Sequence, residues 1–354
     1  MSEKKNKDLH YDGSGTLGGD PAVILVCGQR RRGKSTWWLN YLVEQFEQKG
    51  DMFVWCRRFS VELSGGKKKG EQNLGCMHNF GAGVNKFFHK KITTEGNNIY
   101  SNGKLCGQFA CLALSGNTKG ITIPPEQHYR NFLLDEFLID TPTYHYLNGN
   151  NDPLEFLKIV DSYASPGVDG ADIHHMIMLS NAVTFANPYF LFWEVQPFRG
   201  RYYRDDSRGV VVEMDTNEAF TEHRKATRFG KAVSGTLYDS YAIDNSFMLD
   251  DPKFIAKKPI WATYMYGVRF RSRTFGVWYD SKNGRLYLNN DVIPNRSMYC
   301  LTRDDMSINT LLWRDIKKSP IEFIITAYQI GQLYFSDPIV KSFALDMLAL
   351  FIRK

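Results

Sequence analysis

One segment of this 354-residue chain has residue types and a spacing suited to holding phosphate groups. It reads Gly28-Gln29-Arg30-Arg31-Arg32-Gly33-Lys34-Ser35 and fits the pattern GxxxxGK(S/T) at every fixed position. Glycine lets the backbone turn its N–H groups toward phosphate oxygens, and the start of a following helix adds partial positive charge. The Lys34 ammonium can reach the β- and γ-phosphates, and the Ser35 hydroxyl can ligate Mg²⁺.

The pattern therefore predicts a nucleotide site with ATP and Mg²⁺ as cofactors. The residues expected to bind the nucleotide are Gly28, Gln29, Arg30, Arg31, Arg32, Gly33, Lys34, Ser35 and Thr36.

Two acidic residues further along the chain supply the second requirement of this chemistry. Asp135 and Glu136 follow a short apolar run, and Asp135 would hold Mg²⁺ together with Ser35. Glu136 would act as the base that polarises the attacking water. A glutamate in that place favours hydrolysis over phosphoryl transfer to a small molecule. Asn181 ends another apolar run, where it would sense the γ-phosphate or simply cap a turn.

Buried strands and helices must position these residues. Continuous apolar runs predict strands at residues 22–27, 52–56, 132–134 and 176–179, and helical spacing predicts a helix over residues 34–48. Asn102-Gly103 predicts a hairpin turn. Buried strands alternating with helices predict an α/β fold, a parallel sheet with helices on both faces.

The pattern changes along the chain and suggests four parts. Residues 1–20 are polar and glycine-rich, typical of a flexible tail, and residues 21–197 would form the P-loop ATPase domain. Residues 198–256 are polar and arginine-rich and are interpreted as a lid and helical linker. Residues 257–354 contain short strand-like runs and a helical end, which predicts a smaller C-terminal α+β domain.

Composition sets further limits. There are 44 Lys+Arg against 38 Asp+Glu, a net charge of +6 that is compatible with a polyanionic partner. The 6 cysteines form no CxxC pair, which disfavours zinc and favours a reducing compartment. The start of the chain lacks the apolar core of a secretory signal, and no uncharged apolar run approaches the ~20 residues that span a bilayer, so we expect no membrane partner.

Two basic segments are candidates for nucleic-acid contact. Lys67, Lys68 and Lys69 lie in a glycine-flanked loop, and Arg269, Arg271 and Arg273 would share one face if residues 267–275 formed a strand. Both could contact nucleic-acid phosphate. The alternatives are a solvated turn and a solvated edge strand.

Several longer strings are more specific than these motifs. On them the chain resembles the DNA-packaging ATPases of small tailed phages with protein-primed genomes, the phi-twenty-nine-like group. The strings are LLDEF at residues 133–137, LSNAV at 179–183, NPYFLF at 187–192, RKATRFG at 224–230, IDNSF at 243–247 and FGVWYD at 275–280.

This resemblance implies a ring motor, expected as a homopentamer, that hydrolyses ATP to drive double-stranded DNA into an empty capsid. The ring would dock on the portal (connector), with a scaffold RNA or protein as a further partner, in the host cytoplasm and transiently attached to the procapsid. The P-loop domain would be of the additional-strand catalytic glutamate (ASCE) type. The C-terminal domain would be a degenerate RNase-H-like domain. By the same resemblance Asp135 is the Walker B acid, Glu136 the base, and Asn181 the residue that couples γ-phosphate state to Glu136.

The chain departs from this family where the trans-acting arginine is expected. The matching residues 159–175 read IVDSYASPGVDGADIHH and contain no arginine. Lys158 is the first candidate for this catalytic cation, and Arg57, Lys104 or an arginine of the lid are alternatives. Asp280 stands where an RNase-H-like nuclease has its first metal-binding acid, but isolated acids at strand ends are common turn residues, so nuclease activity is not expected.

Two other functions remain open at this point. One is a P-loop kinase acting on a small metabolite, and the other is a nucleotide-binding nucleic-acid structural protein without turnover. Glu136 and the basic C-terminal region disfavour the first, and the intact set of Lys34, Ser35, Asp135 and Glu136 disfavours the second.

Overall fold

The computed structural model describes residues 9–64, 75–118, 121–139, 147, 152–164, 173–181, 187–195, 198, 200–234, 254–270, 273–313 and 320–352. These divide into two compact units. The first contains the described residues up to Ser234, and the second contains those from Phe254 onward.

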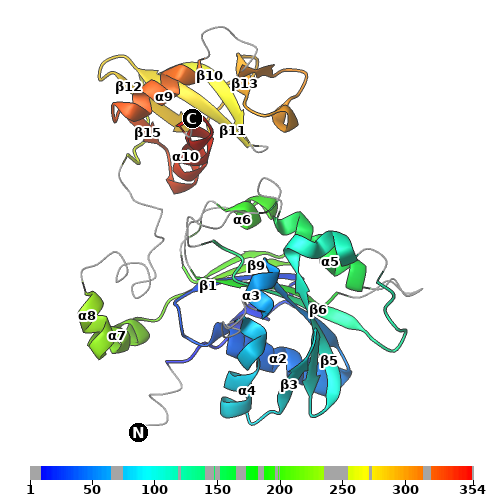
Figure 1. Ribbon diagram of the computed structural model, residues 1–354. Helices are drawn as coiled ribbons and strands as arrows, with labels where there is room; N and C mark the ends of the chain where they lie inside the picture. Colours follow the sequence, from blue (N-terminus) through cyan, green and yellow to red (C-terminus); the bar gives the residue numbers. More distant parts are fainter. Residues whose placement is uncertain are drawn as a thin grey trace, which may run out of the picture. The chain divides into compact units, whose positions relative to one another are not determined.

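The first unit is built on a nine-stranded sheet with the order β3-β4-β5-β2-β6-β7-β1-β9-β8 (Figure 1). From β5 to β9 the neighbouring strands run parallel, and antiparallel strands flank them at both ends. The strands are β1 (Val23–Gly28), β2 (Met52–Arg57), β3 (Ile92–Glu95), β4 (Asn98–Ser101), β5 (Lys104–Cys111), β6 (Tyr129–Asp135), β7 (His175–Ser180), β8 (Tyr202–Asp205) and β9 (Val210–Asp215).

Helices cover both faces of this sheet, as predicted. Ile24 and Val26 of β1 pack in one apolar cluster with Trp38 and Leu42 of the helix that follows the strand. Leu25, which points to the opposite face, is also fully buried. Figure 1 shows α2 and α4 on one side of the sheet and α5 on the other. A strand buried on both faces is apolar at every position, which is why the continuous apolar runs identified these strands.

The helical segments of this unit follow in chain order. They are η1 (Ser14–Thr16), α2 (Lys34–Lys49), α3 (Ser60–Ser64), η2 (Cys76–Asn79), α4 (Ala82–Phe87), η3 (Leu112–Thr118), α5 (Asp152–Tyr163), α6 (Pro188–Phe192), α7 (Glu218–Ala226) and α8 (Arg228–Val233). The hairpin predicted at Asn102-Gly103 joins β4 to β5, and both turn residues have a positive φ, at 51° and 78°. β7 lies between β6 and β1, which is the additional strand of an ASCE sheet.

The prediction of a flexible tail over residues 1–20 is wrong for its described part. The Tyr11 side chain is only 3% exposed, and Thr16 is completely buried. The Tyr11 ring packs edge-on against Trp37 of α2 with 5.9 Å between ring centroids. The Tyr11 backbone N–H donates to the Arg32 carbonyl at 2.9 Å. Polar and glycine-rich composition was misleading here because Tyr11 packs in the core and Arg204 donates to the carbonyls of Gly15 and Gly18, which hold the segment in place.

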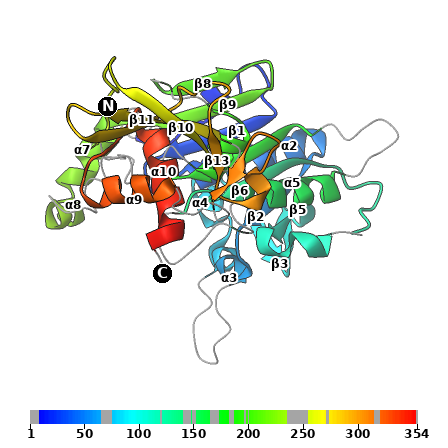
Figure 2. The ribbon, with the colours of Figure 1, turned by 90° about the horizontal axis from the view of Figure 1, so that it is seen from above.

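The prediction of a lid and linker over residues 198–256 is also wrong in its first part. Strands β8 and β9 belong to the main sheet, and β9 pairs in parallel with β1 along its whole length. Figure 2 shows β8, β9 and β1 side by side. The ATPase unit therefore includes these strands, and the described helical part of the predicted linker is α7 and α8.

The second unit is a smaller α+β domain with a six-stranded sheet of order β14-β13-β10-β11-β12-β15. β10, β11 and β12 form an antiparallel meander, and β13 and β14 add in parallel at the β10 edge. This is the strand order of an RNase-H-like sheet, as predicted. Its elements are β10 (Thr263–Phe270), β11 (Arg273–Asp280), β12 (Arg285–Asn289), β13 (Met298–Cys300), η6 (Arg303–Asp305), β14 (Leu311–Leu312), α9 (Ile321–Gln329), β15 (Leu333–Phe335) and α10 (Pro338–Ile352).

The predicted arginine face of residues 267–275 is not formed, because the segment is not one strand. β10 ends at Phe270 and β11 begins at Arg273, and the two strands pair antiparallel with Phe270 opposite Arg273 and Arg269 opposite Thr274. Directly opposed residues share a face of the sheet, so Arg269 and Arg273 lie on opposite faces. Arg273 lies over the Phe343 ring of α10, and Arg271 is outside the described residues.

Candidate nucleotide site

Seven of the nine residues predicted to bind the nucleotide, all but Gly28 and Gln29, line one cavity of about 350 Å³ in the first unit. Because β1, β6 and β7 run parallel, their carboxyl ends meet at the same edge of the sheet. The cavity is lined by Arg30, Arg31, Arg32, Gly33, Lys34, Ser35, Thr36, Asp135, Glu136, Leu179, Ser180 and Asn181. Loop, acidic pair and Asn181 thus lie together, as the sequence predicts.

The loop conformation depends on its glycines. Gly33 has a φ of 91° where α2 begins, in the left-handed region that favours glycine. Gly28 packs so closely on β9 that a Cβ there would lie 2.7 Å from the Asp215 Cβ. These two positions explain why the loop needs glycine at both ends.

Lys34 is held inside the loop that it follows. Its Nζ donates to the carbonyl oxygens of Gly28 at 2.9 Å and Gln29 at 2.8 Å. Burial lowers the pKa of Lys34 to about 8, and the negative charge of Asp215 opposes this effect. A partly desolvated ammonium gains much from an added phosphate charge, which suits a phosphate-binding lysine.

The Mg²⁺-binding oxygens proposed from the sequence are adjacent. The Ser35 hydroxyl donates to Asp135 Oδ1 at 3.1 Å, and both groups are oxygen ligands of the kind that Mg²⁺ prefers. Burial raises the pKa of Asp135, and the neighbouring Arg57 guanidinium opposes that rise. Arg57 lies 2.8 Å from Asp135 Oδ2 and, through its other terminal nitrogen, 2.8 Å from Glu136 Oε2. One guanidinium therefore bridges the proposed metal-binding acid and the proposed base.

Glu136 lies at a strained turn. Its φ is 64°, which is uncommon for a residue with a side chain, and its side chain is 55% exposed. The buried Arg58 guanidinium braces this turn from below, donating to the Phe137 carbonyl at 2.6 Å and the Glu136 carbonyl at 3.3 Å. Arg58 is itself fixed by Asp152 at the start of α5, with Nε and Oδ2 2.5 Å apart. The strained backbone is thus maintained by a buried ion pair.

The strand end that carries Asn181 is tied to the same turn. The Phe137 N–H donates to the Leu179 carbonyl at 3.0 Å, and the Leu138 N–H donates to the Ser180 hydroxyl at 3.2 Å. Asn181 lines the cavity directly after these contacts. The turn that carries Glu136 and the strand end that carries Asn181 are therefore mechanically linked.

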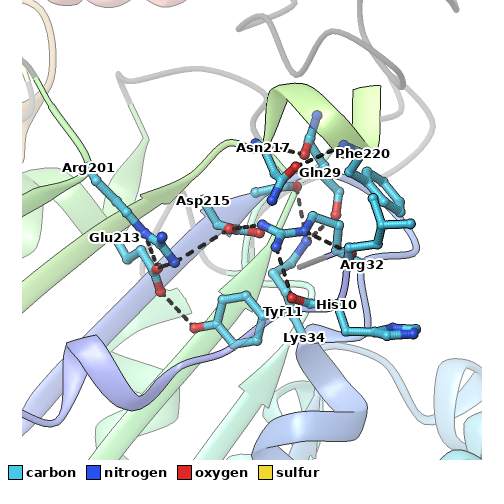
Figure 3. A network of polar contacts seen from close by, with 12 residues as sticks. His10, Tyr11, Gln29, Arg32, Lys34, Arg201, Glu213, Asp215, Asn217 and Phe220 are labelled. Carbon is cyan, nitrogen blue, oxygen red and sulfur yellow. Dashed lines mark hydrogen bonds and ion pairs between the residues drawn. The ribbon is translucent and has the colours of Figure 1, made fainter. Parts of the chain in front are cut away.

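A buried ionic network lies beneath the loop and was not anticipated from the sequence (Figure 3). Arg32 pairs with Asp215, and Arg201 pairs with Glu213 with Nη2 and Oε1 2.6 Å apart. The Tyr11 hydroxyl donates to the other oxygen of Glu213 at 2.7 Å. Both acids are fully buried on β9, so the network joins the N-terminal segment, the P-loop and β9.

The loop also contacts α7. The Gln29 Nε2 donates to the Thr221 hydroxyl at 2.5 Å. The Asn217 N–H donates to Gln29 Oε1 at 3.1 Å (Figure 3). Asn217 in turn caps α7, accepting from the Phe220 N–H at 2.8 Å. The second residue of the P-loop is therefore joined to the cap and first turn of α7.

Other predicted site residues lie elsewhere. Lys158 is on α5, where its Nζ contacts both carboxylate oxygens of Glu155, at 2.8 and 3.0 Å, and it does not line the phosphate cavity of its own chain. Its proposed action on a neighbouring chain stays a prediction. Lys67, Lys68 and Lys69 lie outside the described residues.

Asp280 in the second unit has a structural role. Its Oδ1 accepts from the Trp261 indole and the Lys282 N–H, both at 3.0 Å, and its Oδ2 accepts from the Asn283 amide at 2.7 Å. Within the described part of the chain, no three His, Cys, Asp or Glu residues are grouped to hold a metal ion. Among the described helices, none is long and apolar enough to cross a membrane.

Comparison with known proteins agrees with this architecture. Residues 5–352 match the family described as Podovirus DNA encapsidation protein (Gp16). The DNA packaging protein of Bacillus phage phi29 is 26% identical over 346 residues, covering 97% of this chain and 98% of that protein. The DNA packaging protein of Bacillus phage B103 is 26% identical over 330 residues, covering 93% of this chain and 97% of that protein.

Solved structures show the same likeness. A chain of the bacteriophage Phi-29 viral genome packaging motor assembly has a TM-score of 0.73 and 25% identity, covering 96% of this chain and 99% of that one. The Phi-28 gp11 DNA packaging motor shares the fold, with a TM-score of 0.62 and 16% identity over 96% of this chain and 97% of that one. Since the family match covers nearly every residue of both units, the chain belongs to the Podovirus DNA encapsidation protein (Gp16) family.

Proposed function

We propose that this protein is an ATP-hydrolysing translocase that packages double-stranded DNA into a preformed viral capsid. The observation that carries the proposal is the meeting of an intact P-loop, Asp135, Glu136 and Asn181 around one cavity in a chain of the DNA encapsidation family. Membership of the family supports DNA as the molecule that is moved, and the cavity supports the binding and hydrolysis of ATP.

The first task of the site is to hold the triphosphate. The loop N–H groups and the start of α2 would face the phosphate oxygens, and Lys34 would exchange its two carbonyl partners for the β- and γ-phosphates. Ser35 and Asp135 fit Mg²⁺, since their oxygens lie 3.1 Å apart at the cavity wall. When bound, Mg²⁺ would neutralise the charge that develops on the phosphate oxygens.

The second task is to activate water. Glu136 is exposed at the cavity and would accept the proton of the attacking water. Arg57 orients that carboxylate and balances its charge together with that of Asp135. Asn181 is placed to respond to the γ-phosphate, and the backbone bonds from Phe137 and Leu138 would pass that response to the Glu136 turn.

The partners follow from the family and from the packaging motor assembly to which its structural relative belongs. We propose a homo-oligomeric ring, a pentamer by resemblance, that acts on the portal of a procapsid in the host cytoplasm, with a scaffold RNA or protein as a further partner. A catalytic cation from a neighbouring subunit, for which Lys158 is the first candidate, would complete the site. Lys67, Lys68 and Lys69 are proposed to contact DNA phosphate.

Turnover of ATP with and without double-stranded DNA tests this function. We expect wild-type protein to release free phosphate faster when DNA is added. Glu136→Gln should keep ATP binding and lose turnover by ~10²-fold or more, because the amide cannot accept a proton. Lys34→Ala should lose binding and turnover together. A phosphorylated metabolite in place of free phosphate would support the kinase instead, and binding without any turnover would support a structural protein.

A triple Lys67→Ala, Lys68→Ala, Lys69→Ala variant tests the DNA contact. DNA affinity should fall uniformly across sequences, and the slope of log affinity against log salt should flatten by up to ~0.9 for each DNA phosphate that the variant no longer neutralises. Basal hydrolysis without DNA should remain. An unchanged salt slope with normal DNA stimulation would show that these lysines act only as solubilising charge.

A further inference from the structure

The first turn of α2 has a different neighbour on each exposed side. Ser35 faces Asp135, with Oγ and Oδ1 3.1 Å apart. Thr36 faces α4, where Gly83 packs so closely that a Cβ there would lie 2.8 Å from Thr36 Oγ1. Trp37 faces the N-terminal segment and packs against the Tyr11 ring. The acidic pair therefore lies on one side of this turn, and α4 and the N-terminal segment lie on the others.

These last two elements meet in an exposed aromatic pair. The rings of His10, from the N-terminal segment, and Phe87, from the last residue of α4, are 5.9 Å apart between centroids. Phe87 is 58% exposed, and His10 is also exposed. The Lys86 Nζ lies 5.3 Å from the Phe87 ring centroid. The two rings are inclined at 46° to each other, so a flat ligand can stack on one ring and meet the other at an angle, with positive charge nearby.

The P-loop itself fixes the position of His10. The Arg32 Nη2 donates to the His10 carbonyl at 2.9 Å, as Figure 3 shows, and the next N–H of the chain, from Tyr11, donates to the Arg32 carbonyl at 2.9 Å. Arg32 is anchored below by Asp215, and Tyr11 by Glu213. The buried network therefore holds the His10 backbone against the loop that would hold the phosphates.

A bound triphosphate has two distinct ends. Its γ end must face Asp135, Glu136 and Asn181, because those groups would hold the metal and activate water. Its α end must then lie toward Thr36, at the start of the helix. The nucleoside leaves from the α end, on the side of the turn that faces α4 and the N-terminal segment.

We infer that His10 and Phe87 form the nucleobase subsite of this ATPase, an inference that rests on the nucleotide site proposed above. The base stacks on one ring of the pair and meets the other at an angle, and Lys86 adds positive charge beside Phe87. Every base has a π face, so stacking distinguishes a nucleotide from inorganic triphosphate but discriminates weakly among the bases. We therefore expect ATP and GTP to bind with similar affinity, and both more tightly than inorganic tripolyphosphate.

Equilibrium binding measures this subsite without reference to turnover. Titration calorimetry with Mg²⁺ would compare ATP with inorganic tripolyphosphate on wild type, His10→Ala, Phe87→Ala and the double variant. Loss of one stacking ring should weaken ATP about ten-fold, since base–aromatic stacking is worth roughly 1–3 kcal/mol by alanine substitution. Tripolyphosphate affinity should stay within two-fold of wild type. Phe87→Trp should retain ATP affinity because it keeps a flat ring.

Phe88→Ala is the matched control, because Phe88 is the neighbouring exposed aromatic and is 38% exposed. It should bind ATP as the wild type does, and all variants should melt within a few degrees of wild type. Unchanged ATP affinity in the double variant overturns the subsite, and so does an equal loss for ATP and tripolyphosphate, which would mean that the pair only supports the loop. If the wild type binds neither ligand, the proposed nucleotide site itself is wrong. Lys34→Ala should bind neither ligand and therefore serves as the reference for that result.

Discussion

Arg58 offers a sharp test of how the structure supports catalysis, because it reaches the proposed base only through the backbone. Its guanidinium donates to the carbonyls of Phe137 and Glu136 and pairs with Asp152, and both charged side chains are buried. We predict that Arg58→Met, which keeps most of the side-chain volume, destabilises the first unit and slows hydrolysis while leaving ATP binding nearly intact.

The expected magnitude follows from burial. Removing one partner of a buried ion pair costs about 3–5 kcal/mol, because the remaining charge loses its compensation. Asp152 keeps the Leu147 N–H at 2.5 Å and the Tyr189 hydroxyl at 3.5 Å, which places the expected loss near the lower figure. Release of the strained Glu136 turn should lower turnover about 10- to 100-fold, as small misplacements of reacting groups do.

Urea unfolding and single-turnover hydrolysis measure the two effects separately. The double variant Arg58→Met/Asp152→Asn is the control, because it removes both charges and keeps an acceptor for Leu147. It should regain at least half of the lost unfolding free energy but not the lost turnover. Unfolding free energy within about 1 kcal/mol of wild type, together with normal turnover in Arg58→Met, would refute the idea that this ion pair maintains the Glu136 turn.

Two further predictions concern groups away from the loop. Lys158→Ala should bind ATP normally but lose hydrolysis. Mixing this variant with Lys34→Ala subunits should restore some activity. If Lys158→Ala alone is fully active and mixing gives no rescue, Lys158 is not the trans-acting cation. His175 has a lowered pKa because it is buried, so it is more easily protonated in the unfolded chain. Unfolding free energy should therefore fall as the pH drops from 7 to 5, and a His175→Gln variant should show a flatter pH profile if this residue is responsible.

Much of the sheet and the site was readable from the sequence because local patterns encode them. β1, β2, β6 and β7 are buried on both faces, so each contains a continuous apolar run with polar residues at or directly after its end. The P-loop begins at the last residue of β1, Asp135 is the last residue of β6 and Glu136 follows it, and parallel pairing then brings these groups together. Polar residues at strand ends are thus predictable wherever the strand itself is.

The misses share a different cause. β9 carries Glu213 and Asp215 in its second half, and these acids look solvent-exposed in sequence until their buried partners Arg201, Arg32 and Tyr11 are known. The apolar run Val210–Val212 is the feature of the sequence that could have predicted this strand. Similarly, Arg271-Ser272 separates β10 from β11 without the asparagine or glycine typical of hairpin turns, so the hairpin resembled one strand. Long-range ion pairs and atypical turns produce no periodic pattern of apolar residues, so such patterns do not predict them.

The Arg32–Asp215 pair also has a consequence for the order of events during synthesis. Its partners are 183 residues apart, and the Tyr11–Glu213 bond spans 202 residues. At a translation rate of about 5–20 residues per second, the loop leaves the ribosome roughly 10–40 s before the strand that completes its support. During most of that interval β1 lacks both of its neighbours, because β7 (His175–Ser180) emerges only shortly before β9, and the edge facing β9 stays unpaired until the end. A nascent chain of this protein should therefore gain its nucleotide affinity in a single late step, when residues 210–215 emerge, which arrested chains ending on either side of that strand would reveal.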